Sequence, residues 1–297
     1  MKQGVLLVNK PTGYTSFDVI AVLRGILKER RLGHTGTLDP MATGVLPVLI
    51  GKAARAADIL PDSSKSYEAD FVLGMSTDTQ DTSGETVKTS DKRVNEQDVL
   101  SALNSFKGKI MQLPPMYSAV SVNGKRLYEL ARQGIEVERQ PREIEIFDIS
   151  LVSFDESAQS GKLSITCSKG TYIRTIINDL GERLGTYGAM SALVRTSSHG
   201  FGLDKCLTLD EIKSHSDIES VIISVDSLFD CCKRLDLSEK QAKMYKNGVK
   251  LDTSRVKGAA QNGIYRVYAK GEAVDSEFLG LCSVSDGEIR VYKNFWE

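Results

Sequence analysis

GHTGTLDPMATGVLP, residues 33–47, is the stretch of this 297-residue chain around which the rest can be interpreted. It places one carboxylate, Asp39, among three glycines and two prolines (Gly33, Gly36, Gly44, Pro40 and Pro47). Glycine permits backbone conformations that other residues avoid, whereas proline fixes φ and donates no hydrogen bond. The composition therefore predicts a rigid, shaped loop, neither helix nor strand, that presents Asp39 and His34.

Asp39 alone fits two interpretations. Loop aspartates usually form turns or caps, yet an Asp-Pro peptide among so many glycines is a costly arrangement that persists mainly where it serves function. The chain contains no GxSxG, GxxxxGK[ST] or GxGxxG motif. A glycosidase needs a second acid, and no feature distinguishes Asp70, Asp78 or Asp81 for that role. Any chemistry at this loop is therefore expected to use one carboxylate, without a metal or a cofactor.

Strands and helices mix along the chain without a regular alternation. Apolar alternation, as at Tyr67, Ala69, Phe71 and Leu73, predicts strands at 4–9, 67–73, 144–154, 163–168 and 195–201. Helical spacing predicts helices at 52–60, 96–106, 125–133 (ended by Gly134) and from the turn at 169–174 to 181. A further helix, capped by Thr15 or Ser16, would carry the apolar residues Phe17, Ile20, Leu23 and Leu27. This order favours an α+β fold with a largely antiparallel sheet.

The composition and apolar pattern of the chain change after about residue 207. An acidic, irregular zone extends to 236, and a compact tail follows, with a helix predicted at 238–247 and strands at 263–269, 278–284 and 288–293. We therefore expect a large domain at 1–234 and a small β-rich domain at 235–297.

Composition bounds the function. Five scattered cysteines without a CxxC pair, and three histidines without ligand spacing, argue against zinc and disulfides. The net charge is only −1, but residues 1–60 carry eight Lys and Arg against four Asp and Glu, a local excess that can bind phosphate. The short N-terminal apolar run lacks a cleavage site, and no run reaches membrane-spanning length, so we expect a cytoplasmic protein without membrane contact.

Five segments in order resemble the TruB-type bacterial tRNA pseudouridine-55 synthases. They are NKPTGYTS (9–16), GHTGTLDPMATGVLP (33–47), KSYEADFVLG (65–74), QLPPMYSAV (112–120) and KGTYIRTIINDLG (169–181). The resemblance spans about residues 5–201. It implies a pseudouridine-synthase fold with a mixed, largely antiparallel sheet flanked by helices, followed by a PUA-like RNA-binding domain. It also implies isomerisation of uridine-55 in the T-loop of tRNA, with the T-arm as partner and no cofactor or metal, by a chain that we expect to be a monomer.

The resemblance also assigns roles. Asp39 would be the nucleophile, Arg174 its ion-pair partner that keeps it ionised, and Tyr67 would stack on the uracil and remove the C5 proton. Among the substrate-binding residues, Tyr172 would line the pocket, Leu193 would pack on the flipped base, His34 would fill the place that the uracil vacates, and Lys10 would meet substrate or phosphate. Without the family, these residues would pass for surface, core or turn residues.

Two departures from the family and two rival functions remain. Leu193-Val194-Arg195 stands where the family commonly has Leu-Arg-Arg, so one expected basic group is missing, and the tail lacks a clear PUA signature. A non-catalytic RNA-binding protein and an RNA N-glycosidase are the alternatives. Asp39, Arg174 and Tyr67 together disfavour the first, and a single marked carboxylate disfavours the second. Asp39 could attack the base or ribose C1′, or act through a glycal.

Overall fold

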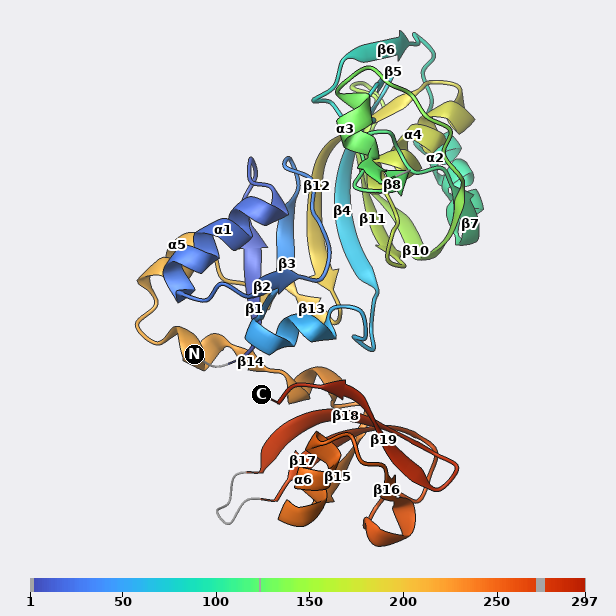
Figure 1. Cartoon of the computed structure of the whole chain (residues 1–297). Coiled ribbons are helices and arrows are strands. Elements are labelled where there is room, and N and C mark those ends of the chain that lie inside the picture. Colours follow the sequence, from blue (N-terminus) through green and yellow to red (C-terminus); the bar gives the residue numbers. More distant parts are fainter. Residues whose placement is uncertain (1–2, 123, 271–275, 297) are drawn as a thin grey trace.

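The computed structural model describes residues 3–122, 124–270 and 276–296. Its larger part is built on a ten-stranded sheet, and a smaller C-terminal part on a five-stranded sheet (Figure 1). The larger sheet contains β1 (Gly4–Lys10), β2 (Leu32–His34), β3 (Thr43–Ile50), β4 (Lys65–Leu73), β7 (Gly108–Gln112), β10 (Arg142–Asp155), β11 (Ser160–Cys167), β12 (Gly188–Ser198), β13 (Phe201–Gly202) and β14 (Ile223–Ser224).

The strand order is β14-β1-β3-β12-β4-β11-β10-β7, with β2 added to β3 and β13 to β12. β3 and β12 run parallel, and the other described neighbours run antiparallel. The expected α+β class, with a mixed and largely antiparallel sheet, is confirmed. Because β12 and β4 lie at its centre, residues on them are close to β3 and to the loop that precedes β3.

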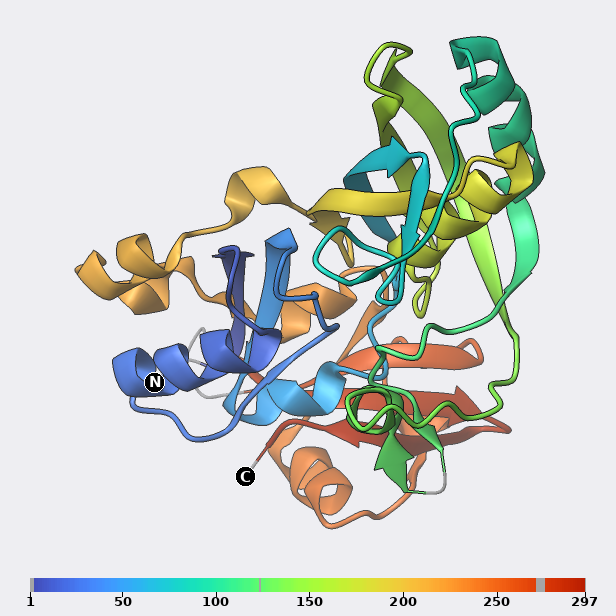
Figure 2. The same cartoon turned by 90° about the horizontal axis from the view of Figure 1, so that it is seen from above.

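Burial on β4 follows the predicted alternation. Tyr67, Ala69, Phe71 and Leu73 are buried, whereas Glu68 and Asp70 point to the other face and form ion pairs with Lys162. The apolar face packs on α2 (Glu96–Leu103) and α4 (Ile173–Leu184), which cover one side of this half of the sheet (Figure 2). α4 buries Ile173, Ile176, Ile177, Leu180 and Leu184.

The other half of the sheet packs on α1 (Ser16–Leu27) and α5 (Leu209–Ser214). Thr15 caps α1 as expected, because its side chain accepts the backbone N–H of Asp18 while Asp18 accepts the N–H of Thr15. Shorter elements connect the strands: β5 (Met75–Thr77), β6 (Thr86–Thr89), β8 (Ser121–Val122), β9 (Lys125–Arg126), α3 (Leu127–Ala131), and the 3₁₀ turns η1 (Gly51–Ala56), η2 (Asn104–Phe106), η3 (Leu203–Lys205), η4 (Ile218–Val221), η5 (Asp226–Phe229) and η6 (Thr253–Arg255).

The C-terminal sheet has its own core. Its order is β15-β17-β18-β19-β16, and α6 (Glu239–Lys246) packs against it. The strands are β15 (Lys233–Leu237), β16 (Leu251–Asp252), β17 (Gly263–Ala269), β18 (Glu277–Ser285) and β19 (Glu288–Asn294). Leu281 and Phe295 from this part join Val5, Leu49 and Phe229 in a second apolar cluster, so the two parts share buried surface. The expected small β-rich C-terminal part is confirmed.

Several local predictions were wrong. Only the middle of 33–47 is a loop, because Gly33 and His34 belong to β2, residues 43–47 belong to β3, and β3 pairs with both β2 and β1. The ring of Phe17 is 64% exposed, and Val19 takes its place in the core. The helix at 52–60 is the short turn η1, and 125–126 forms β9 rather than helix. β12 starts seven residues before the start of the predicted strand at 195–201 and ends three residues before its end. α4 extends past 181 to Leu184.

Candidate active site

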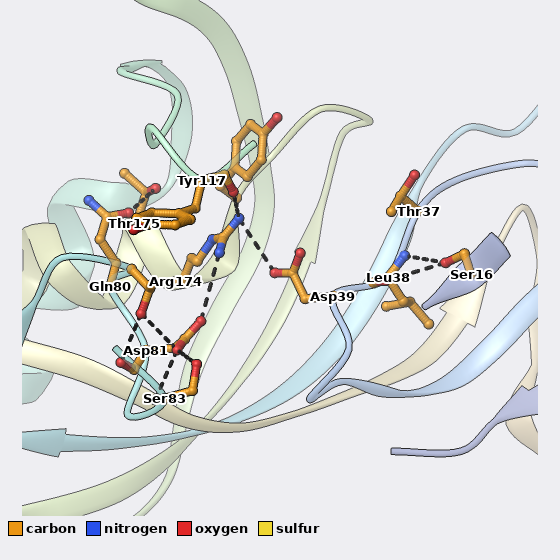
Figure 3. Close-up of polar contacts among 12 residues, drawn as sticks. Ser16, Thr37, Leu38, Asp39, Gln80, Asp81, Ser83, Tyr117, Arg174 and Thr175 are labelled. Carbon is orange, nitrogen blue, oxygen red and sulfur yellow. Dashed lines mark hydrogen bonds and ion pairs between the residues drawn. The ribbon is translucent and has the colours of Figure 1, made fainter. Parts of the chain in front are cut away.

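The Asp39 loop, residues 35–42, leaves β2 and enters β3, and a buried serine of α1 holds it. The backbone N–H of Leu38 donates to Ser16 Oγ at 2.8 Å, and Ser16 Oγ donates to the Leu38 carbonyl at 3.3 Å (Figure 3). The N–H of Ala42 closes the turn on the Asp39 carbonyl at 3.0 Å. The backbone around Asp39 is therefore fixed from both sides.

The turn after β1 holds the same loop. The N–H of Gly13 donates to the Pro40 carbonyl at 2.8 Å. The Lys10 side chain is fully buried, and its ammonium donates to the carbonyls of Pro11, Tyr14 and Pro40 at 2.9, 2.6 and 3.4 Å. Burial lowers the pKa of Lys10 to about 8. The ammonium thus faces loop carbonyls and not solvent, which differs from the contact with substrate or phosphate expected of it.

Arg174, in the first turn of α4, lies between two carboxylates. One terminal nitrogen is 3.6 Å from Asp39 Oδ2, the other is 3.7 Å from Asp81 Oδ2, and the guanidinium also donates to the Tyr117 carbonyl at 2.5 Å (Figure 3). The Arg174 side chain is only 6% exposed, whereas that of Asp39 is 34% exposed. The structure therefore brings Asp39 and Arg174 together and leaves Asp39 the accessible member of the pair.

Asp81 is the residue of this group that sequence reasoning missed. Its Oδ1 accepts from the hydroxyls of Thr79 and Ser83, at 2.9 and 2.5 Å, and from the N–H of Ser83 at 3.0 Å. These bonds leave Oδ2 aimed at Arg174. Nothing in the polar run 77–85 distinguishes Asp81 from Asp78; only the parallel bridge of Asp81 to Met190 on β12 brings it beneath Arg174.

The pKa of Asp39 lies above its ordinary value. Burial of the carboxylate contributes most to this rise, and the negative charge of Asp81 adds to it, while Arg174 and Lys10 act in the opposite direction. The sequence predicted that Arg174 would keep Asp39 ionised. The guanidinium does favour the charged form, but it also faces Asp81, and its effect does not outweigh burial. Asp39 therefore ionises at higher pH than an exposed aspartate.

Tyr67 lies on β4 directly opposite Arg195 of β12 and is 6% exposed. Burial raises the pKa of the Tyr67 hydroxyl, and the Arg195 guanidinium partly offsets that rise. A phenol beside a buried guanidinium is better able to give up its proton than one buried among apolar groups alone.

Arg195 is the second functional residue that sequence reasoning passed over. It is fully buried, and its guanidinium donates to the carbonyls of Val45, Gly36 and Thr37 at 2.7, 3.1 and 3.4 Å. It thereby ties β12 to the Asp39 loop. Gly44, opposite Arg195 with φ of +106°, has no room for a side chain, because a Cβ would lie 2.2 Å from the Arg195 carbonyl oxygen. An arginine two residues after Leu193, on the inward face, was the available signal.

The remaining predicted site residues lie around this centre. Tyr172 directly precedes α4, with its N–H and carbonyl both bonded to the Gln112 side chain at 2.8 and 3.0 Å, and its ring lies 5.9 Å from the Arg174 guanidinium. Leu193 is 7% exposed and belongs to the same apolar cluster as Tyr67. His34 ends β2 and is half-buried. Burial lowers the pKa of its imidazole, and the charges of Arg195 and Lys65 lower it further, which favours the neutral form.

Within residues 3–122, 124–270 and 276–296, no group of three or more His, Cys, Asp or Glu side chains is placed to hold a metal ion. In the same ranges, no helix is both long and apolar enough to cross a membrane.

Comparison with known proteins identifies the class first. Residues 24–173 match the family model described as TruB family pseudouridylate synthase (N terminal domain), and residues 174–230 match that of the tRNA pseudouridylate synthase B C-terminal domain. The crystal structure of a Cbf5-Nop10-Gar1 complex superposes with a TM-score of 0.71 over 99% of this chain and 85% of that chain, at 23% identity. The fold is therefore that of the pseudouridine synthases.

Curated relatives make the assignment narrower. The tRNA pseudouridine synthase B of Bacillus subtilis (strain 168) is 44% identical over 85% of this chain and 84% of its own length. That of Clostridium kluyveri is 40% identical over 98% of this chain and 99% of its own length. The chain belongs to the TruB family of pseudouridylate synthases, which are isomerases.

Proposed function

We propose that this chain converts uridine-55 in the T-loop of tRNA to pseudouridine, by flipping the base and using Asp39 as the nucleophile, without a cofactor. One observation carries the proposal: Asp39, on a loop fixed by backbone hydrogen bonds, lies 3.6 Å from the buried Arg174 guanidinium. The proposed substrate is inferred from the relatives, which are named tRNA pseudouridine synthase B.

The chemistry balances without an outside reagent. The bond between ribose C1′ and uracil N1 breaks, the base turns, a bond forms between C1′ and C5, C5 loses its proton and N1 gains one. An ionised Asp39 can attack ribose C1′ or the base, or act through a glycal. In each route the carboxylate must be ionised and directed, and Arg174, 3.6 Å from Asp39, favours the charged form and gives it a fixed partner, against the rise in pKa that burial causes.

The other residues have roles around the flipped base. Tyr67 would stack on the uracil and take the C5 proton, which agrees with its place beside Arg195. Tyr172 and Leu193 would line the pocket. His34, which directly precedes the loop, would occupy the space that the uracil leaves and so offset part of the few kcal/mol lost on unstacking. Lys10 would act on the substrate indirectly, by holding the carbonyl of Pro40.

The RNA partner would be the T-arm, recognised by loop shape and a flipped base. We propose that residues 1–234 form the catalytic domain and 235–297 a PUA-like RNA-binding domain. This boundary falls inside β15 (Lys233–Leu237), and the separate core of the C-terminal sheet supports a division near this point. We propose a cytoplasmic location, because tRNA is the proposed substrate. We also propose that the chain is a monomer.

A single assay tests the proposal. Purified protein is mixed with unmodified tRNA, and the T-loop is analysed for pseudouridine, for an abasic site and for released uracil. We expect pseudouridine at position 55 with the unaltered protein. Asp39→Asn and Asp39→Ala should abolish the product and leave tRNA binding largely intact. An abasic site with free uracil would instead indicate an N-glycosidase, and binding without any change to the RNA would indicate a non-catalytic RNA-binding protein.

A further inference from the structure

Lys65 starts β4 two residues before Tyr67, so both side chains point to the same face of the sheet. Two residues of strand separate their Cα atoms by about 7 Å. The Lys65 ammonium lies against the Asp39 loop: a Cβ built on Gly36 would lie only 2.9 Å from Lys65 Nζ. Lys65 is thus on the same face of the sheet as Tyr67 and directly beside the loop that carries Asp39.

The charge of Lys65 is not neutralised by the protein. In the described part of the chain, Lys65 has no hydrogen-bond or ion-pair partner, and its surroundings are mainly cationic or neutral. The titratable groups around it are Arg195, Cys167, Lys169, His34 and His199. Burial, with Arg195 and Lys169, lowers the pKa of Lys65 to about 8. An unpaired ammonium in such a place is unfavourable until an anion joins it.

Two hydroxyls beside Lys65 also lack partners. Thr35 directly precedes Gly36, and Ser198 is the cross-strand neighbour of Lys65. Thr35 Oγ1 and Ser198 Oγ are buried without a hydrogen-bond partner among the residues described. Leaving a buried hydroxyl unpaired costs about 1–3 kcal/mol. Both oxygens are out of contact with solvent, so a ligand outside the protein would reach the Lys65 ammonium and not these hydroxyls.

We propose that Lys65 binds a phosphodiester group of the RNA backbone next to the reacting nucleotide, and so positions that nucleotide against Tyr67 and the Asp39 loop. The inference rests on the proposed function, since it needs an RNA substrate. The contrast with two buried cations near the loop supports it: Lys10 and Arg195 direct their donors to backbone carbonyls, whereas Lys65 is only partly buried. Lys65 alone of these three keeps its donors free.

The first test measures the salt dependence of binding. Unmodified tRNA is titrated against Asp39→Asn protein, which binds without turnover, at several salt concentrations. Adding Lys65→Met should weaken binding about tenfold and reduce the slope of log K against log salt by about 0.7, as the loss of one phosphate contact predicts. Lys65→Arg should keep the slope. Lys162→Met is the matched control, because it removes the same charge from the neighbouring strand on the opposite face.

The second test measures proton uptake. A phosphate beside Lys65 raises the pKa of its ammonium, so RNA binding at pH 8 should take up roughly half a proton. Calorimetry in two buffers of different ionisation enthalpy gives this number. Lys65→Arg should lose the uptake while keeping the affinity. Loss of the proton uptake in Lys65→Arg would exclude Lys10 as its source, because Lys10 is unchanged in that variant. Arginine also preserves the charge and the bulk of the side chain at this position.

The outcomes separate the two proposals. If the unaltered protein forms no pseudouridine in tRNA, the proposed function fails. If it forms pseudouridine, but Lys65→Met leaves the salt slope unchanged or Lys65→Arg leaves the proton uptake unchanged, only the role of Lys65 is wrong. If the Lys65→Met protein does not fold, the proton uptake of Lys65→Arg alone decides. Retained uptake in that variant overturns the inference.

Discussion

The two sides of the site are held in different ways. On the Asp39 side, Ser16, Lys10 and Arg195 all bond to main-chain groups of the loop. On the Arg174 side, a side-chain carboxylate, Asp81, shares the guanidinium with Asp39. Backbone anchoring sets the position of a loop whatever its charge state, whereas a shared ion pair also changes the pKa of Asp39. Substitutions on the first side should therefore act mainly on stability, and those on the second mainly on pH dependence.

The largest expected effect comes from breaking the Arg174 side. Arg174→Ala should lower kcat by about 10²–10³, which is typical for loss of a preorganised charge at a reacting centre. Since Arg174 lowers the pKa of Asp39, its removal should move the acidic limb of the pH–rate profile to higher pH. The measurement is kcat against pH with tRNA substrate. An unchanged rate and profile would show that Arg174 does not act on Asp39.

Substitutions that remove an anchor of the Asp39 loop should act first on the stability of the fold. Arg195→Met leaves the carbonyls of Val45, Gly36 and Thr37 without their donor in a fully buried place, and the free energy of unfolding should fall by about 3 kcal/mol. Urea denaturation gives this value. Arg234→Met is the control, because that arginine is on the C-terminal sheet and its side chain is 45% exposed. Equal stability of the two variants would contradict the anchoring role.

Asp81→Asn sharpens the comparison, because it changes charge with little change of shape. Asp81 raises the pKa of Asp39, so its neutralisation should move the acidic limb to lower pH, opposite in direction to Arg174→Ala. Weaker positioning of Arg174 should cost about tenfold in kcat. Asp70→Asn, on the outer face of the sheet, should leave the profile in place. A shift in the same direction for Asp81→Asn and Arg174→Ala would refute the shared ion pair.

The smallest effect is expected at Phe17. Its ring is 64% exposed and lies 5.6 Å from the Arg24 guanidinium, so Phe17→Ala should change the free energy of unfolding by less than about 0.5 kcal/mol. Val19→Ala on the same helix should have the opposite outcome: because Val19 is fully buried, this substitution should lower the free energy of unfolding by about 2 kcal/mol. Chemical denaturation compares the two, and equal losses would mean that the helix face is assigned wrongly.

Local pattern predicted the elements better than their limits. Alternation on β4 and the cap at Thr15 were correct because neighbouring residues decide them. The 33–47 stretch was wrong at its ends because glycine and proline suit a loop, but pairing with β1 overrides that preference. Phe17 was misplaced because a helical period identifies an apolar stripe without saying which of its residues reaches the core.

The sequence by itself indicated the family, the mixed sheet and the β-rich tail, because those follow from motifs and short-range periodicity. It proposed Asp39, Arg174 and Tyr67 as site residues through the resemblance to the family. Only the tertiary structure decided which acid shares Arg174, that Lys10 and Arg195 bond to loop carbonyls, and that Lys65 keeps its ammonium free. These contacts join residues 30 to 159 positions apart. Spacing along the chain carries no information about which distant backbone carbonyl or carboxylate a buried cation will meet.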